Sequence, residues 1–161
     1  MTDALRSICE QCTYQNNPRL DFIPAQLTRH KEIILRDLRE IVSVASNEHE
    51  KACVMLAGSV LEAILFAFLQ GQEAQVAARR GRFTVDPDQD LQNYLNIFNK
   101  WFGRDFPNLE LPDVLVNYRN LVHFNRELSL PPDECRKAAL TLLRTLDALI
   151  RELSAYGHIP P

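Results

Sequence analysis

One short segment brings together side chains that could act on a phosphate ester. Residues 116–127 read Val-Asn-Tyr-Arg-Asn-Leu-Val-His-Phe-Asn-Arg-Glu, and their apolar positions have helical spacing. On one helix Arg119 and His123 would be neighbours, and Arg126 would extend the same stripe. An imidazole can transfer a proton near neutral pH, and guanidinium groups can hold a phosphate and stabilise its developing charge. The set suits RNA cleavage without a metal, although such stripes are also typical of solvated or ion-paired helix faces.

The run Tyr118-Arg119-Asn120-Leu121-Val122-His123 resembles the signature of HEPN domains (higher eukaryote and prokaryote nucleotide-binding), in which an Arg and a polar residue precede a His. The apolar segment 56–65 also resembles the long central helix of bacterial HEPN proteins, and the resemblance covers about residues 27–155. It implies a helical bundle that forms a homodimer, with one cleft shared by two copies of the motif. It also implies catalytic roles: Arg119 would stabilise the phosphate, Asn120 would orient Arg119, and His123 would transfer the proton.

Two functions follow from this resemblance, and the sequence leaves both open. The first is a metal-independent endoribonuclease without a cofactor, which acts on RNA and can be neutralised by an antitoxin or another protein partner. The second is a catalytically inactive HEPN-like module for dimerisation or for binding a partner or a nucleotide. The spacing favours the second function, because the family's ribonucleases have four to six residues between Arg and His and this chain has three. The net charge of −3 points weakly in the same direction.

Glu62 is the only charged residue in the apolar run 52–69. A buried carboxylate is costly unless it is paired, so Glu62 is expected to have a partner. On a functional interpretation, Glu62 orients His123 or pairs with Arg119 and thereby supports the site. On a structural interpretation, some arginine at the edge of the bundle merely neutralises the carboxylate.

A second basic segment, Arg79-Arg80-Gly81-Arg82-Phe83, combines three arginines with an aromatic ring. Arginines bind nucleic-acid backbones and aromatic rings stack on bases, so Arg79, Arg80 and Arg82 are candidate RNA contacts. Arginine at the end of a helix is also favourable simply because of the helix dipole. The acidic segment 86–90 follows at once and would neutralise part of this charge.

Hydrophobic periodicity predicts the elements that must position these residues. Apolar residues recur at steps of three and four, and no period-two segment of useful length occurs. The sequence therefore predicts an all-α fold, a single antiparallel HEPN-like bundle of about five helices. The expected helices cover about 24–46, 48–79, 91–102, 112–127 and 134–156. Residues 1–22 lack periodicity and are expected to form an irregular N-terminal arm, with the helical domain at 23–157.

Composition narrows the function classes further. No GxxxxGK[ST] or GxGxxG motif occurs, so a phosphate-binding loop of either kind is not expected. The chain begins without an apolar run, and the segment 52–69 carries an acid near its middle, so we expect a cytoplasmic protein without a membrane span. Cys9 and Cys12 lack the further ligands of a zinc site and are interpreted as accessible thiols of the arm, with no metal. Cys53 and Cys135 lie on apolar stripes and are interpreted as core residues.

Overall fold

The computed structural model describes residues 4–79, 84–122 and 130–156, apart from the side chains of 74–79 and 122. Within these ranges the chain contains no strand, which confirms the all-α prediction. The α-helices are α1 (Ala4–Glu10), α2 (Thr28–Ser46), α3 (Glu50–Arg79), α4 (Leu91–Phe102), α5 (Val114–Arg119) and α7 (Glu134–Tyr156). Two short 3₁₀ helices are η1 (Thr13–Asn16) and η2 (Asn120–Val122).

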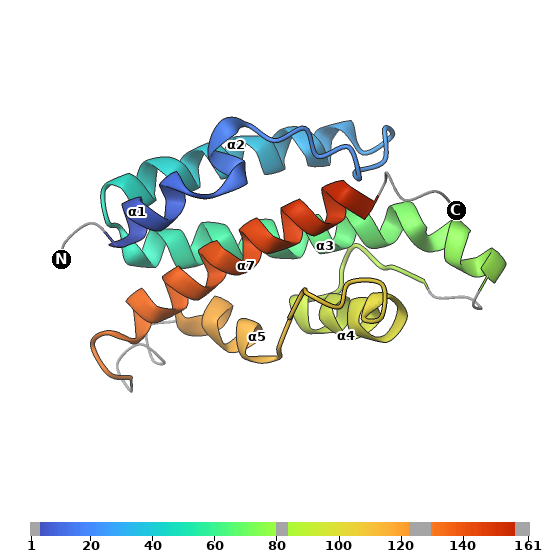
Figure 1. Cartoon of the computed structure of the whole chain (residues 1–161). Helices are drawn as coiled ribbons and strands as arrows, with labels where there is room; N and C mark the ends of the chain where they lie inside the picture. The colour runs from blue at the N-terminus through green and yellow to red at the C-terminus, as the bar shows by residue number, and fades with distance from the viewer. Residues whose placement is uncertain (1–3, 80–83, 123–129, 157–161) are drawn as a thin grey trace.

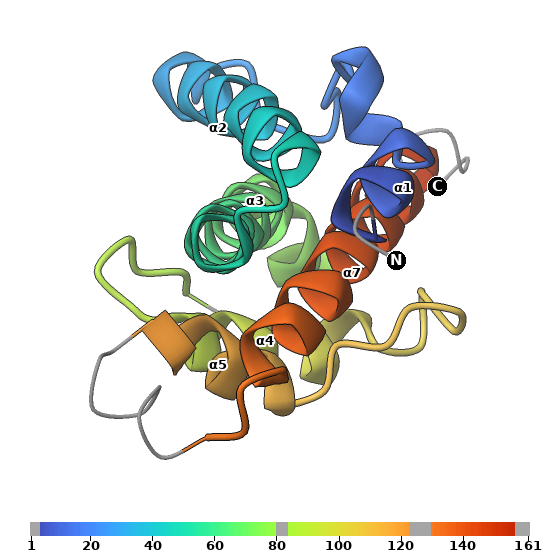
Figure 2. The same ribbon diagram turned by 90° about the vertical axis from the view of Figure 1, so that its left-hand side faces the viewer.

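Helix α3 lies at the centre of the bundle (Figure 1). Helices α1 and α2 lie on one side of it, α4 and α5 lie on the other, and α7 runs beside it (Figure 2). Its side chains from Ile64 to Leu69 are all buried, because neighbouring helices cover this stretch on every side. By length and composition α3 could also cross a membrane, but 67% of its apolar window is buried inside the fold. Such burial is typical of a helix in the core of a bundle.

The predicted helices at 48–79, 91–102 and 134–156 agree closely with α3, α4 and α7. Helix α2 begins at Thr28, so Pro24 precedes the helix and does not occupy its first turn. Asp90 caps α4, because its side chain accepts a hydrogen bond from the backbone N–H of Asn93 at 3.0 Å. Gly103 follows the last residue of α4, and the helix predicted over 91–102 ends at the same place.

The N-terminal segment is not the irregular arm that the sequence predicts. Helix α1 packs against α2 and α7, and the side chain of Leu5 is fully buried. The Glu48 carboxylate accepts hydrogen bonds from the Leu5 backbone N–H at 3.1 and 3.2 Å, which satisfies an amide that has no partner within the helix. Asp147 of α7 accepts hydrogen bonds from the backbone N–H and the hydroxyl of Thr13 at 2.7 and 2.8 Å. Residues from Ala4 onward therefore belong to the packed bundle.

The interpretation of Cys9 and Cys12 as accessible thiols is also wrong. Their exposed fractions are 2% and 5%, because α1 and the turn after it are packed into the core. Burial raises the pKa of Cys9 to about 11, and the neighbouring Cys12 contributes to the same shift. Cys53 is fully buried, as predicted, and its burial raises its pKa to about 12. Cys135 is half-buried at the start of α7.

Candidate functional site where helices α3 and α5 cross

Arg119 is the last residue of α5, and Asn120 begins the 3₁₀ helix that follows. The buried side chain of Leu115 fixes the inner face of α5, which packs against α3 and α7. The prediction of one α-helix across 112–127 is wrong, because α5 gives way to η2 at Asn120. A 3₁₀ helix has about 3.0 residues per turn, so the α-helical stripe predicted from Arg119 onward does not continue through η2. His123 and Arg126 lie outside the described residues.

The stem of Arg119 rests directly on α3 at Gly58. A Cβ atom added at position 58 would lie 2.6 Å from Arg119 Cγ and 3.2 Å from Arg119 Cβ. These separations are shorter than van der Waals contact between carbon atoms, so only the absence of a side chain at Gly58 permits the approach. The contact fixes the first atoms of the Arg119 side chain and leaves its guanidinium as the part that can respond to a ligand.

Glu62 lies one helical turn after Gly58 and pairs with Arg119. The distance from Arg119 Nη2 to Glu62 Oε2 is 3.3 Å, and the two side chains are 39% and 25% exposed, so solvent reaches the pair. Burial raises the pKa of Glu62, the nearby Arg119 charge lowers it in part, and the carboxylate of Asp90 raises it. The partner expected for the Glu62 carboxylate is therefore Arg119, the arginine that the HEPN resemblance also singles out.

The acidic segment 86–90 lies close to the Arg119–Glu62 ion pair. Tyr94 of α4 is buried and donates a hydrogen bond from its hydroxyl to the backbone carbonyl of Asp86 at 2.8 Å. Burial raises the pKa of Tyr94, and the charges of Glu62, Asp86 and Asp88 raise it further. Because Asp90 also acts on Glu62, the segment and the start of α4 contribute negative charge to the surroundings of Arg119. Sequence reasoning did not identify Tyr94 and Asp90 as neighbours of the site, since no local pattern links them to Glu62.

The remaining predicted contacts fall largely outside the described residues. Arg79 ends α3, but its side chain is not described, and Arg80 and Arg82 lie outside the described ranges. The structure therefore does not relate these arginines to Arg119. In the part of the chain that the structure describes, no group of three or more His, Cys, Asp or Glu side chains is arranged to hold a metal ion.

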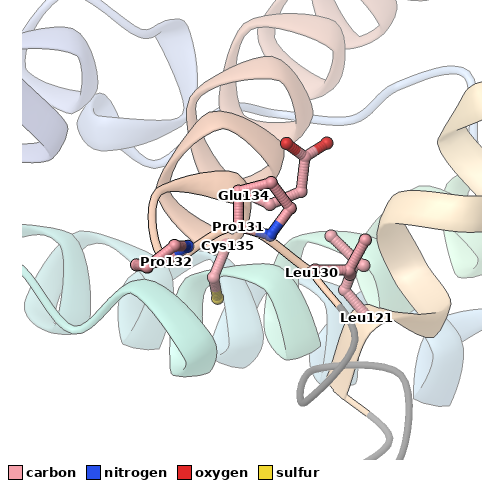
Figure 3. A pocket seen from close by; sticks show the side chains of 6 residues that line it. All are labelled: Leu121, Leu130, Pro131, Pro132, Glu134 and Cys135. Atoms are coloured by element: carbon pink, nitrogen blue, oxygen red, sulfur yellow. The ribbon is translucent and has the colours of Figure 1, made fainter.

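A small pocket opens next to η2 and the start of α7 (Figure 3). Its volume is about 130 Å³. The residues that line it are Leu121, Leu130, Pro131, Pro132, Glu134 and Cys135. Leu121 directly follows Asn120, so the pocket adjoins the candidate site. Ligand pockets usually have volumes of roughly 300–1,000 Å³, so this pocket suits a single side chain better than a nucleotide.

The arrangement can bind an oxyanion. A guanidinium has five N–H donors, and one carboxylate cannot occupy all of them, so Arg119 retains donors for a second acceptor. Asn120, half-buried at the start of η2, is adjacent in the chain and offers an amide group. No family model, no curated protein and no solved structure matches this chain.

Proposed function

We propose that this chain is a HEPN-like helical domain that acts as a homodimer and cleaves single-stranded RNA without a metal ion. The observation that carries the proposal is the position of Arg119, whose stem rests on Gly58 and whose guanidinium is partly exposed beside Glu62. A charged group that is already held in place needs little reorganisation when charge develops on a phosphate, and such preorganisation is often the largest contribution to catalysis. The HEPN resemblance of Arg119, Asn120 and His123 supports the same assignment.

In the proposed reaction, His123 takes the proton from a 2′-hydroxyl group, and the resulting oxygen attacks the adjacent phosphorus. Arg119 stabilises the charge on the non-bridging oxygens, Asn120 orients Arg119, and the protonated His123 gives its proton to the 5′-oxygen as the bond from phosphorus to that oxygen breaks. The products carry a 2′,3′-cyclic phosphate and a 5′-hydroxyl. Single-stranded RNA is the expected substrate because its backbone and bases are accessible. Arg126 is proposed as a supporting residue of this site.

The proposal also covers the oligomeric state, the location and the partners of the protein. A second copy of the chain would complete the cleft, the location would be the cytoplasm, and a partner protein would act as an antitoxin. Arg79, Arg80 and Arg82 are proposed as contacts to the RNA backbone outside the cleft. The measurement that tests the homodimer is the molar mass in solution, determined by light scattering after size-exclusion chromatography.

The charge around Arg119 favours a second candidate function, the catalytically inactive module for dimerisation or partner binding. Glu62 neutralises Arg119 at 3.3 Å, and Asp90 adds negative charge beside Glu62. Such surroundings oppose the approach of a phosphate. In this candidate, Arg119 joins α5 to α3 through Glu62 and Gly58, and its role is structural.

One experiment separates the two functions. Purified protein is incubated with labelled single-stranded RNA, with and without EDTA, and the products are examined for 2′,3′-cyclic phosphate ends. The ribonuclease predicts cleavage that survives EDTA and is lost in H123A, while circular dichroism and the dimer remain unchanged. The inactive module predicts no cleavage, together with loss of stability or of the dimer in R119A. Cleavage that persists in H123A contradicts the ribonuclease.

A further inference from the structure

Arg119 already has an anion beside it, and this anion must affect how a phosphate binds. We propose that Glu62 is an internal competitor that holds the Nη2 edge of the Arg119 guanidinium until a phosphate of the RNA displaces it from that edge, and that Glu62 thereby sets the affinity of the site. The inference rests on the proposed function, because it concerns the phosphate that Arg119 would bind.

The geometry places a carboxylate where a phosphate oxygen would bind. Carboxylate and phosphate groups use the same guanidinium donors, and both bind arginine through two parallel hydrogen bonds when they are free to do so. Glu62 Oε2 lies 3.3 Å from Arg119 Nη2, and both side chains are partly exposed, so an incoming phosphate can reach the same edge of the guanidinium. An exchange of one anion for the other at Arg119 therefore requires only side-chain movement.

The backbones of both residues are held in place. Glu62 belongs to the middle of α3, which packs against α2, α4, α5 and α7, and the stem of Arg119 rests against Gly58. With the backbones in these positions, the carboxylate stays close to any phosphate that binds Arg119. A negative charge at this distance in a half-exposed position weakens the binding of a second anion by about tenfold.

The surroundings of Glu62 leave its charge only partly compensated. Among the described residues, three groups act on it from neighbouring elements: Arg119 at the end of α5, Asp90 at the start of α4, and Tyr94 within α4. Arg119 favours the ionised carboxylate, whereas burial and the Asp90 charge oppose it, and Tyr94 carries no charge at neutral pH. The Arg119 charge therefore offsets only part of the cost of a charged Glu62. An RNA phosphate that takes the place of this carboxylate at Arg119 breaks an ion pair that is only weakly stabilised.

Helix α3 carries a second ion pair that provides a matched control. Glu50 Oε1 lies 3.1 Å from Arg136 Nη1, and each side chain is 31% exposed. The substitutions E62Q and E50Q change the net charge by the same amount on the same helix. Position 50 is displaced from position 62 by about 18 Å along the helix axis, because each residue adds 1.5 Å. E50Q therefore reports the general effect of charge on RNA binding.

The experiment measures binding of a short fluorescein-labelled single-stranded RNA by fluorescence anisotropy. The RNA carries 2′-O-methyl groups, so it cannot be cleaved through its 2′-oxygen. E62Q keeps an oxygen that accepts a hydrogen bond from Arg119 but removes the charge, so we expect RNA binding to tighten by about tenfold relative to the wild type. E50Q is expected to change the affinity by less than about twofold, and the difference between the variants should shrink with added salt. E62D keeps the charge, but its side chain is one methylene shorter, so on a fixed backbone its carboxylate draws back from Arg119, and RNA binding should tighten by less than in E62Q.

The outcomes distinguish this inference from the proposed function. If the wild type binds RNA and E62Q binds it equally or more weakly, Glu62 is not a competitor, and the proposed function stands. If E62Q and E50Q tighten binding equally, the effect is one of net charge and the inference fails. If no variant binds RNA, the proposed function and the inference are both overturned. Should E62Q fail to fold, an E62D protein that binds RNA no more tightly than the wild type would overturn the inference.

Discussion

Gly58 and Arg119 touch where α3 and α5 cross, with 2.6 Å between a Cβ added at position 58 and Arg119 Cγ. This single contact has two consequences. It lets α5 approach the central helix, and it fixes the side chain that the proposed chemistry requires. The stability of α5 and the function of Arg119 are therefore linked through a residue that has no side chain.

A methyl group at position 58 tests this link. In G58A the added atom must displace Arg119, which costs about 1–3 kcal/mol, and the better helix propensity of alanine returns about 0.5–1 kcal/mol. We expect a net loss of about 0–2.5 kcal/mol in the free energy of unfolding, measured with urea, and RNA cleavage lowered by about tenfold or more. S59A, at the exposed next position, should change the stability by less than about 0.5 kcal/mol. A G58A protein that is more stable than the wild type would contradict the close packing.

The guanidinium of Arg119 can be tested without removal of its charge. Lysine keeps the positive charge but lacks the planar set of donors that matches a phosphate. If Arg119 stabilises the phosphorane, R119K should lower single-turnover cleavage of RNA by about a hundredfold. H123A should lower it by about 10²–10⁴-fold, as expected for loss of a general acid or base. Equal rates for R119K and the wild type would show that Arg119 does not act on the phosphate.

The titration of Glu62 should appear in the pH dependence of stability. Burial, partly offset by Arg119, raises the pKa of Glu62 above its ordinary value of 4.5, so the folded protein holds this proton more tightly than the unfolded chain. The stabilisation that protonated Glu62 adds to the free energy of unfolding is thus fully present below pH 4.5. It is lost as the pH rises through the pKa of Glu62 in the folded protein. We expect the free energy of unfolding of the wild type, relative to the non-ionisable E62Q, to fall over this window.

A second variant checks the sign of that effect. Removal of the Arg119 charge in R119M should raise the pKa of Glu62 further and move the loss of stability to higher pH. Urea unfolding at a series of pH values measures both differences. A wild-type minus E62Q difference that stays constant with pH would show that Glu62 does not titrate as inferred.

The sequence predicted the long helices because each repeats its apolar positions over several turns. Helix α4 is the clearest case, with Leu91, Tyr94, Leu95 and Phe98 all buried and Gly103 at its end. Helix α1 was missed because seven residues contain too few turns for a period to be recognised. Its stability comes from contacts with distant residues, such as the Glu48 carboxylate at its first turn, which no local pattern shows.

The candidate site was also predicted only in part from the sequence. The sequence singled out Arg119 by its resemblance and Glu62 by its isolation in an apolar run, and these two residues meet at 3.3 Å. Which arginine pairs with Glu62 depends on how α5 crosses α3, and that crossing is made possible by Gly58, which carries no chemical signal of its own. The end of α5 at Arg119 was missed because no residue type marks it: an asparagine follows the helix at position 120, but an asparagine also lies inside the helix at position 117.

The buried thiols give a prediction that is independent of RNA. With a pKa of about 11, Cys9 is ionised in only about one molecule in a thousand at pH 8, and Cys53, with a pKa of about 12, is ionised still less. Cys12 is also buried. We expect these three thiols to resist alkylation by iodoacetamide in the folded protein and to react readily in urea, while the half-buried Cys135 reacts first. Peptide mass spectrometry after a timed reaction measures each site, and rapid labelling of folded Cys9 or Cys12 would contradict the packing of α1.

Phe68 joins parts of the chain that are far apart in sequence, so its replacement tests whether the bundle unfolds as one unit. Within the described residues, its ring contacts five aromatic rings with centroid distances of 5.1–6.5 Å: Phe22, Phe98, Phe102, Phe106 and Tyr156. F68A removes these contacts from a fully buried position and should lower the free energy of unfolding by about 3–5 kcal/mol. M55A, on the same helix but 54% exposed, should cost less than about 0.5 kcal/mol.

Because Phe68 contacts the loop before α2 as well as α4 and α7, the loss should shift one cooperative transition seen equally by circular dichroism and by Trp101 fluorescence. Separate transitions in the two signals would show that α4 and its loops unfold independently of α2, α3 and α7.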